Sequence, residues 1–130
     1  MTGLTGEARR LLASEPLIAH LSTCRDDRPH VAPIWFDVVD DGIEIVTTGR
    51  KLANLRENPR VAMSIVRERE AGQPEWHVAV RGTATVVDDE AASREAGRRI
   101  NRRYGADADA WLENVLVRID VGSTSVSRYE

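Results

Sequence analysis

The chain has 130 residues, of which 42% are hydrophobic and 30% are charged, which fits one folded domain over residues 1–130 and excludes a disordered chain. Its formal net charge of -3 argues against a general nucleic-acid binder, and its single cysteine, Cys24, rules out an intrachain disulfide. Because no apolar stretch reaches the length of a signal peptide or a membrane span, we expect a cytoplasmic protein without membrane contact.

The first third of the chain predicts a short helix followed by antiparallel strands. Residues 7–13 have an amphipathic pattern that ends shortly before a proline. The pattern then becomes alternating, which predicts a strand over residues 17–24, and a polar turn leads to a second strand over residues 30–39. Asp40-Asp41-Gly42 predicts a tight hairpin to a third strand, residues 43–46.

A short helix is predicted inside the stretch TTGRKLANLRENP, residues 47–59. Leu52 and Leu55 lie three residues apart, so they share the face that we expect to be buried. The polar side chains expected to face solvent or a ligand are Arg50, Lys51, Asn54 and Arg56. A helix of about eight residues is marginal by itself, so its stability must come from what it packs against.

Two cations, Arg50 and Lys51, open this helix at the end where the backbone dipole prefers an anion. An anionic ligand would remove the conflict, because free N–H groups, the hydroxyls of Thr47 and Thr48 and the two cations together form a phosphate cradle. The alternative is an ordinary solvated turn, which such sequences often form. Lys51 is the only lysine beside 17 arginines, which favours a specific role for its ammonium group.

The second half predicts more antiparallel strands and one longer helix. In order, we expect a strand over residues 60–66, a charged loop over residues 67–74, a strand over residues 76–87, a helix from Asp88 or Asp89 to about Tyr104, and strands over residues 116–120 and 125–129. Gly82 suggests a bulge or barrel corner. The expected inner stripe of the helix is Ala92, Ala96, Ile100 and Tyr104. Short antiparallel strands with few helices predict a closed or nearly closed β-barrel.

Two groups of residues are weaker candidates for function. His20, Cys24 and His30 have no zinc-site spacing, so we favour packed or hydrogen-bonded side chains and expect no metal site. The last helix carries five arginines along one side: Arg94, Arg98, Arg99, Arg102 and Arg103. We interpret this side as a solvated face whose charge is balanced by Glu90 and Glu95. The alternatives are nucleic-acid binding and docking of an anionic coenzyme tail.

The order of these parts resembles the flavin-binding split β-barrel family typified by pyridoxamine 5'-phosphate oxidase. The similarity rests on the motifs RPH, PIWF, DDG, TTGRK, LANL and NPRVAMSI, and it is strongest over residues 27–67. The most specific element is Arg50-Lys51 followed by Asn54-Leu55 and the run from Asn58 to Val61. The resemblance implies a mainly β fold with flanking helices, an antiparallel split β-barrel of six to seven strands, in a homodimer with cofactor at the subunit interface.

The same resemblance implies a set of residues that bind FMN. Arg50 and Lys51 would hold the phosphate, and Thr47 and Thr48 would line the phosphate or ribityl end. His77 stands where the oxidase branch carries a glutamine that reaches the flavin. The complete expected set is Pro33, Ile34, Trp35, Thr47, Thr48, Arg50, Lys51, Asn54 and His77.

By resemblance, the function is hydride transfer between FMN and a small organic substrate, with the chemistry supplied by the cofactor. The chain ends in VGSTSVSRYE without the substrate-binding Arg-x-His motif of the oxidase branch, so we do not expect oxidation of vitamin B6 compounds. Two alternatives stay open: a reductase that uses a deazaflavin coenzyme, and a protein that binds flavin or haem without turnover. The sequence names neither a substrate nor a catalytic acid or base.

Overall fold

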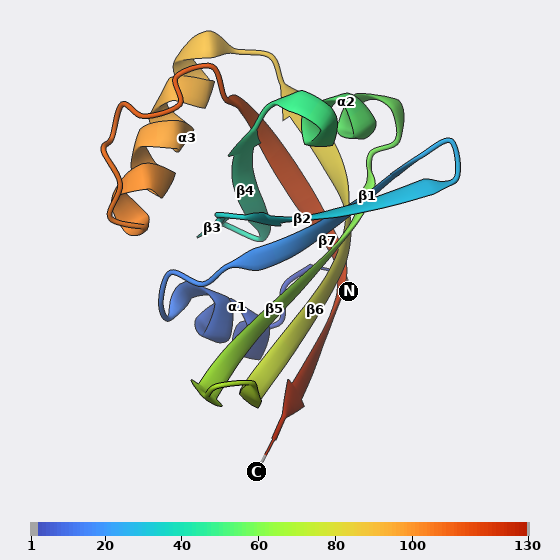
Figure 1. Cartoon of the computed structure of the whole chain (residues 1–130), viewed down its shortest axis with the longest axis vertical. Helices are drawn as coiled ribbons and strands as arrows, with labels where there is room; N and C mark the ends of the chain where they lie inside the picture. Colours follow the sequence, from blue (N-terminus) through green and yellow to red (C-terminus); the bar gives the residue numbers. More distant parts are fainter. Residues whose placement is uncertain (1–2, 130) are drawn as a thin grey trace.

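The computed structural model describes residues 3–129 as one curved antiparallel sheet with three helices around it (Figure 1). The strands are β1 (Ala19–Arg25), β2 (Arg28–Ile34), β3 (Asp37–Val39), β4 (Gly42–Thr47), β5 (Arg60–Glu70), β6 (Gln73–Val87) and β7 (Val115–Arg128). The helices are α1 (Gly6–Ala13), α2 (Gly49–Glu57) and α3 (Glu90–Arg103). The predicted fold, mainly β with flanking helices and an antiparallel split barrel, is confirmed.

The order of the strands explains why the sheet closes on itself. Neighbouring strands of the sheet follow the order β2-β1-β5-β6-β7-β4-β3, so β2 and β3 lie at its two edges. Only Trp35 and Phe36 separate these two strands in the chain, and such a link spans at most about 11 Å. The two ends of the sheet must therefore come together, and the barrel has a seam at this link.

The interior of the barrel follows directly from the alternating sequence pattern. In β1, Ala19, Leu21 and Thr23 are buried, and Leu21 pairs with the buried Met63 of β5. Phe36 and Trp76 are among the largest fully buried side chains. Each fully buried aliphatic or aromatic side chain contributes roughly 1.5–3 kcal/mol, so this interior is the main source of stability.

The structure corrects the predicted strands in three places. The expected strand over residues 30–39 is two strands, because the chain leaves β1 and joins β4 at the seam. The expected loop over residues 67–74 is a β-ribbon in which only Ala71 and Gly72 form the turn. The two expected closing strands are the single strand β7.

Gly82 occupies the predicted irregularity in the barrel. The register of β6 and β7 shifts between Arg81 and Gly82, so that Gly82 pairs with Val121 and Arg81 pairs with Ser123. A Cβ atom at Gly82 would lie 2.5 Å from the carbonyl oxygen of Asp120. Only glycine allows this close approach of two backbones.

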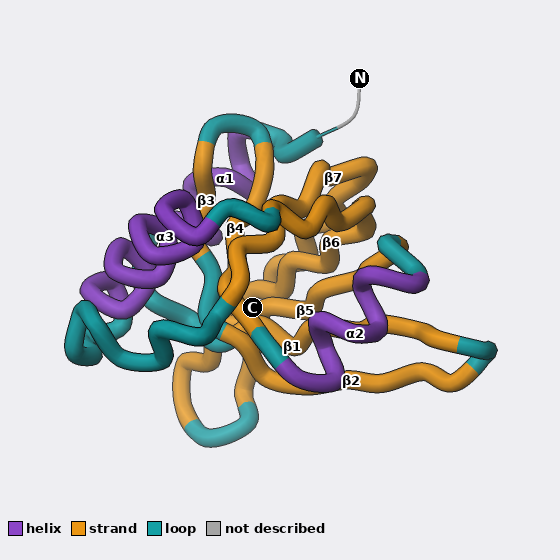
Figure 2. The backbone as a smooth tube through the Cα atoms, turned by 90° about the horizontal axis from the view of Figure 1, so that it is seen from above, coloured by secondary structure: helices purple, strands orange, loops and turns teal. Residues whose placement is uncertain are grey.

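The helices pack on different parts of the sheet, and α2 and α3 lie at opposite sides of the strands in Figure 2. Helix α3 contacts β4 and β7, whereas α2 contacts β1 and β6. The buried stripe of α3 is Ser93, Ala96, Ile100 and Asn101, while the predicted Ala92 and Tyr104 are only half-buried. Among residues 3–129, none of the helices is long and apolar enough to cross a membrane.

Candidate functional site

A cleft of about 510 Å³ opens at the seam of the barrel. The end of β2, the end of β4, the start of α2, the end of α3 and the segment before β7 all contribute to it. The lining residues are Ile18, Pro33, Ile34, Trp35, Val46, Thr47, Thr48, Lys51, Ile100, Asn101, Trp111 and Asn114. Six of the residues predicted to bind a cofactor are therefore together here: Pro33, Ile34, Trp35, Thr47, Thr48 and Lys51.

One end of the cleft is the N-terminus of α2. Gly49 has a φ of +68°, which glycine adopts without strain, and this lets the chain turn from β4 into the helix. Thr48 is the N-cap residue, but its side chain makes no capping hydrogen bond, and the first turn contains no acidic residue. The backbone N–H groups of this turn are thus left without a capping side chain.

The cations of this turn also lack ion-pair partners among residues 3–129. Arg50 is exposed and Lys51 is half-buried, and within residues 3–129 neither forms an ion pair. Arg56 at the other end of the same helix differs, because it contacts Asp88 at 2.7 Å. This contact raises the pKa of Arg56 chiefly through a hydrogen bond from its guanidinium. Positive charge therefore accumulates at the cleft end of α2, where it suits an anionic group.

Aromatic rings also line the cleft. The Trp35 ring stacks on Tyr104 with a centroid distance of 4.7 Å and an interplanar angle of 5°. The Trp111 ring meets Trp35 nearly at a right angle, 83°, at 5.6 Å. Both indoles line the cleft, so it offers two aromatic walls that meet in a corner. Such surfaces favour flat, extended ring systems.

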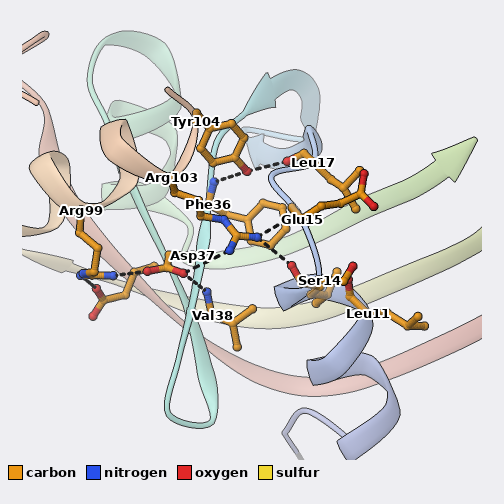
Figure 3. Close-up of polar contacts among 12 residues, drawn as sticks. Leu11, Ser14, Glu15, Leu17, Phe36, Asp37, Val38, Arg99, Arg103 and Tyr104 are labelled. Carbon is orange, nitrogen blue, oxygen red and sulfur yellow. Dashed lines mark hydrogen bonds and ion pairs between the residues drawn. The ribbon is translucent and has the colours of Figure 1, made fainter. Parts of the chain in front are cut away.

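The position of Trp35 is fixed from behind by Tyr104. The Tyr104 hydroxyl donates to the carbonyl oxygen of Leu17 at 2.6 Å and accepts from the N–H of Phe36 at 3.2 Å (Figure 3). Burial raises the pKa of Tyr104, so the phenol stays neutral and keeps its proton for Leu17. The ring is therefore tied to the chain on both sides of the seam and offers Trp35 a rigid surface.

Arginines of α3 hold the neighbouring segments together. Arg103 donates to the carbonyl oxygens of Leu12 and Glu15, each at 2.9 Å, which ties the end of α1 to α3 (Figure 3). Arg99 pairs with Asp37 at 2.7 Å and also with the buried Glu44. Burial works against its charge, but these hydrogen bonds outweigh burial and raise the pKa of Arg99.

These contacts correct the prediction of a solvated arginine face for Arg99 and Arg103, which are structural residues. Arg94 pairs with Glu90 as predicted, and Arg98 pairs with Asp109. A second cleft of about 500 Å³ lies beside Arg99, between the β3–β4 hairpin and α3. Because Arg99 and Arg118 already pair with Asp37 and Glu44, it offers an anionic ligand little unsatisfied positive charge.

Three predicted residues do not line the seam cleft. Arg50 lies next to it at the exposed start of α2. Asn54 is buried instead of exposed as predicted, because its Nδ2 donates to Thr23 Oγ1 at 3.0 Å. His77 lies in β6 with its Nε2 2.8 Å from Ser64 Oγ. The amide of Asn54 anchors α2 to β1, and His77 belongs to the face of the sheet outside the barrel.

The sequence analysis missed several residues of the cleft, chiefly Asn101, Trp111 and Asn114. Trp111 had a local signal, since Trp111-Leu112 is a large apolar pair in an otherwise polar connection. The candidates His20, Cys24 and His30 do not gather, and the described residues contain no group of three potential metal ligands.

The chemistry of the cleft is that of binding rather than of proton transfer. Lys51 is the one titratable side chain among its described lining residues. A cation, an uncapped helix N-terminus and two indole rings line this one cleft. The arrangement can hold a planar ring that carries a phosphate, with any redox chemistry supplied by the ligand itself.

Comparisons with known proteins agree with this geometry. A family model described as pyridoxamine 5'-phosphate oxidase matches residues 4–126. An F420 reductase of known structure is 27% identical, with a TM-score of 0.74 and coverage of 89% of this chain and 94% of that one. An FAD-binding protein from Mycobacterium smegmatis is 26% identical over 100% of both chains, with a TM-score of 0.67.

Another solved structure shares the fold alone. It is a haem storage protein from Vibrio cholerae, 19% identical, with a TM-score of 0.74 and coverage of 95% of this chain and 93% of that one. None of the curated proteins matches this chain.

Proposed function

Because this chain belongs to the pyridoxamine 5'-phosphate oxidase family, we propose that it binds FMN in the seam cleft and acts as a flavin-dependent oxidoreductase on a small organic molecule. The observation that carries the proposal is the pairing of a cationic, uncapped helix N-terminus with an indole-lined wall in one cleft. When bound, the flavin supplies hydride transfer. The proposed substrate is a small organic molecule other than a vitamin B6 compound, as expected in the sequence analysis.

The residues of the chain have distinct tasks in this proposal. Arg50, Lys51 and the first N–H groups of α2 bind the phosphate, each charge-assisted hydrogen bond contributing on the order of 1.5–3 kcal/mol. The hydroxyls of Thr47 and Thr48 lie between this anchor and the ring. Pro33, Ile34 and Trp35 hold the ring and keep water from one side of it. A fixed anchor at one end orients the ring at the other.

We propose further that the protein is a homodimer. The outer face of β1, β2 and β5 carries small and apolar side chains, including Val31, Val66 and Ala62, and Val31 is 64% exposed. Ile18 is exposed beside this face and also lines the cleft, so the two surfaces are continuous. A second copy on this face would cover the apolar residues, and the His77 of one copy would approach the cleft of the other.

The second candidate function is a reductase that uses a deazaflavin coenzyme, and the similarity to an F420 reductase favours it. The same phosphate anchor and aromatic wall would serve this coenzyme. The alternative of docking its anionic tail along α3 has little support, since four of the five α3 arginines already have partners. A cytoplasmic location is part of both proposals and is supported by the single free cysteine.

Equilibrium titration of the purified protein with FMN and with the deazaflavin coenzyme, side by side, tests the proposal. Tight binding of FMN with quenched flavin fluorescence would support it, and turnover of the reduced cofactor with an added acceptor would establish catalysis. A preference for the deazaflavin would select the second function. Binding of neither would overturn both, and haem would then be the next ligand to test.

A further inference from the structure

Trp111 lies on the segment that connects α3 to β7, and it projects a large apolar side chain at the mouth of the cleft. Its side chain is 54% exposed, and the adjacent Leu112 is 62% exposed. Tryptophan is usually well buried in a folded protein, so this exposure leaves a large apolar surface uncovered. The ring is positioned all the same, because it meets Trp35 edge to face.

The backbone at Trp111 is in an unfavourable conformation. Its φ is +54°, in the left-handed region, which bulky residues rarely adopt and which glycine and asparagine adopt far more easily. A tryptophan that only connects two elements could be replaced by glycine with less strain. The strain and the exposed indole together indicate that this side chain is retained for what it contacts.

The surrounding contacts hold the segment in place. On the side toward α3, Asn101 Nδ2 donates to the carbonyl oxygens of Ala108 and Ala110, each at 3.1 Å. On the side toward β7, the N–H of Asn114 donates to the carbonyl oxygen of Trp111 at 3.1 Å. Arg98 adds an ion pair to Asp109 at 2.8 Å. The segment is therefore tied down on both sides of the strained residue.

The two indoles of the cleft differ in what supports them. One face of Trp35 is already occupied by Tyr104, whereas Trp111 makes a right-angled contact to Trp35 and keeps 54% of its surface exposed. A flat ligand that enters the corner can stack its ring face on Trp111 and place its edge against Trp35. It can equally stack on Trp35 and place its edge against Trp111. A ligand without an extended ring leaves the indole exposed.

We propose that Trp111 is a ring-binding residue that makes the cleft specific for an extended, planar heteroaromatic ring. This inference rests on the proposed function and adds a residue to it that the sequence resemblance does not supply. The phosphate is bound at the opposite end by α2, so the two ends of the ligand are recognised independently. Trp111 thus affects affinity for the ring and not for the phosphate.

The test uses Trp111→Gly and Trp111→Asn, which remove the indole from a backbone position that glycine and asparagine accept. Trp111→Phe keeps an aromatic ring, and Leu112→Ala is the control for the adjacent exposed side chain. The ligands are FMN, riboflavin, which has the ring without phosphate, and ribose 5-phosphate, which has the phosphate without the ring. Affinity is measured by titration and folding by the melting temperature.

We expect Trp111→Gly and Trp111→Asn to weaken the binding of FMN and of riboflavin about tenfold. This is the size of the loss when an aromatic side chain that stacks on a nucleic-acid base is removed. Trp111→Phe should recover most of this loss. Binding of ribose 5-phosphate, and FMN binding by Leu112→Ala, should be unchanged.

The outcomes separate this inference from the proposed function. If the wild-type protein binds FMN and the FMN affinity of Trp111→Gly differs from it by less than twofold, Trp111 does not bind the ring. Only this inference then fails. Equal losses for riboflavin and ribose 5-phosphate would also overturn it, because the effect would then be general. If the wild-type protein binds no flavin-type ring at all, the proposed function fails first.

Discussion

Helices α2 and α3 both begin directly after a strand, yet their first turns are opposite in chemistry. Helix α3 is capped by Asp89, whose Oδ1 accepts from the N–H of Ala92 at 2.9 Å, and Glu90 follows in the first turn. Helix α2 begins at Thr48, which makes no capping hydrogen bond, and continues with Arg50 and Lys51. Helix α3 caps its own N-terminus, whereas α2 leaves its N-terminus without a capping side chain.

The difference has an energetic meaning. A capping side chain contributes about 1 kcal/mol, and an acidic residue in the first turn adds about 0.3–1 kcal/mol. Helix α2 lacks both and carries two cations that the helix dipole disfavours by similar amounts. An isolated turn of this kind is destabilised, and a bound phosphate converts the same groups into favourable contacts. The comparison therefore supports the proposed phosphate site without reference to any relative.

The largest expected effect comes from removing the two cations. Replacing Arg50 and Lys51 together by alanine should weaken FMN binding at least 100-fold, because two charge-assisted contacts to the phosphate are lost. The melting temperature should stay the same or rise slightly, since neither residue forms an ion pair within residues 3–129. Titration and thermal unfolding measure the two effects separately.

The matched control is Arg56→Ala on the same helix. Arg56 contacts Asp88 and lies at the far end of α2, so FMN affinity should change less than twofold. Unchanged FMN affinity in the double variant, with the control equally unchanged, would show that α2 does not hold the phosphate.

Local patterns were sufficient to predict much of the molecule. Strands β1 and β5 are buried on one face only, so apolar and polar residues alternate along them. This alternation predicted both the strands and the residues that point into the barrel. The turn TTGRK predicted the start of α2 because glycine, hydroxyl groups and cations have clear local preferences. Six expected cofactor residues come from the two chain segments that meet at the seam, and they line one cleft.

The features that were missed depend on contacts between distant residues. The chain breaks between β2 and β3 because Phe36 is buried and its N–H donates to Tyr104, 68 residues away, and no polar residue marks the break. Asn54 is buried because Thr23, 31 residues earlier, accepts its hydrogen bond. The ribbon after Val66 is solvated on both faces, so its charged sequence shows no alternation. None of these causes is present in a local window.

The second largest effect concerns the buried anchors of the two helices. Each helix is joined to a strand by a buried side-chain hydrogen bond. Asn54 of α2 donates to Thr23 of β1, and Ser93 of α3 accepts from the N–H of Leu116 of β7 at 2.9 Å. Asn54→Ala leaves a buried hydroxyl without its partner and a small cavity, so we expect a loss of about 1–3 kcal/mol in the free energy of unfolding. Chemical denaturation measures this loss.

The same experiment separates structure from binding at Asn54. The double variant Asn54→Ala with Thr23→Val removes both partners and should recover part of the stability. FMN affinity of the folded Asn54→Ala protein should fall less than that of the Arg50 and Lys51 variant. A larger loss of affinity than of stability would instead assign the amide to the cofactor.

A third change would make α2 resemble α3. Thr48→Asp introduces a capping carboxylate, which should stabilise the protein by up to about 1 kcal/mol. The carboxylate also occupies the N–H groups and repels a phosphate, so FMN affinity should fall about tenfold. Thr48→Ser is the control, because it keeps the hydroxyl and adds no charge. An aspartate variant that gains stability and keeps its FMN affinity would place the phosphate elsewhere.

The smallest effect is expected from the reciprocal change at α3. Asp89→Ala removes the cap of a helix whose N-terminus has no part in the cleft, so stability should fall by about 1 kcal/mol while FMN affinity stays the same. Asp89→Asn keeps a good capping side chain without the charge, and it should recover most of the loss. If Asp89→Ala weakened FMN binding as strongly as Thr48→Asp does, the two N-termini would be coupled through the barrel. The difference between the capped N-terminus of α3 and the uncapped one of α2 would then no longer explain the site, because a change at either N-terminus would alter the FMN affinity of the cleft.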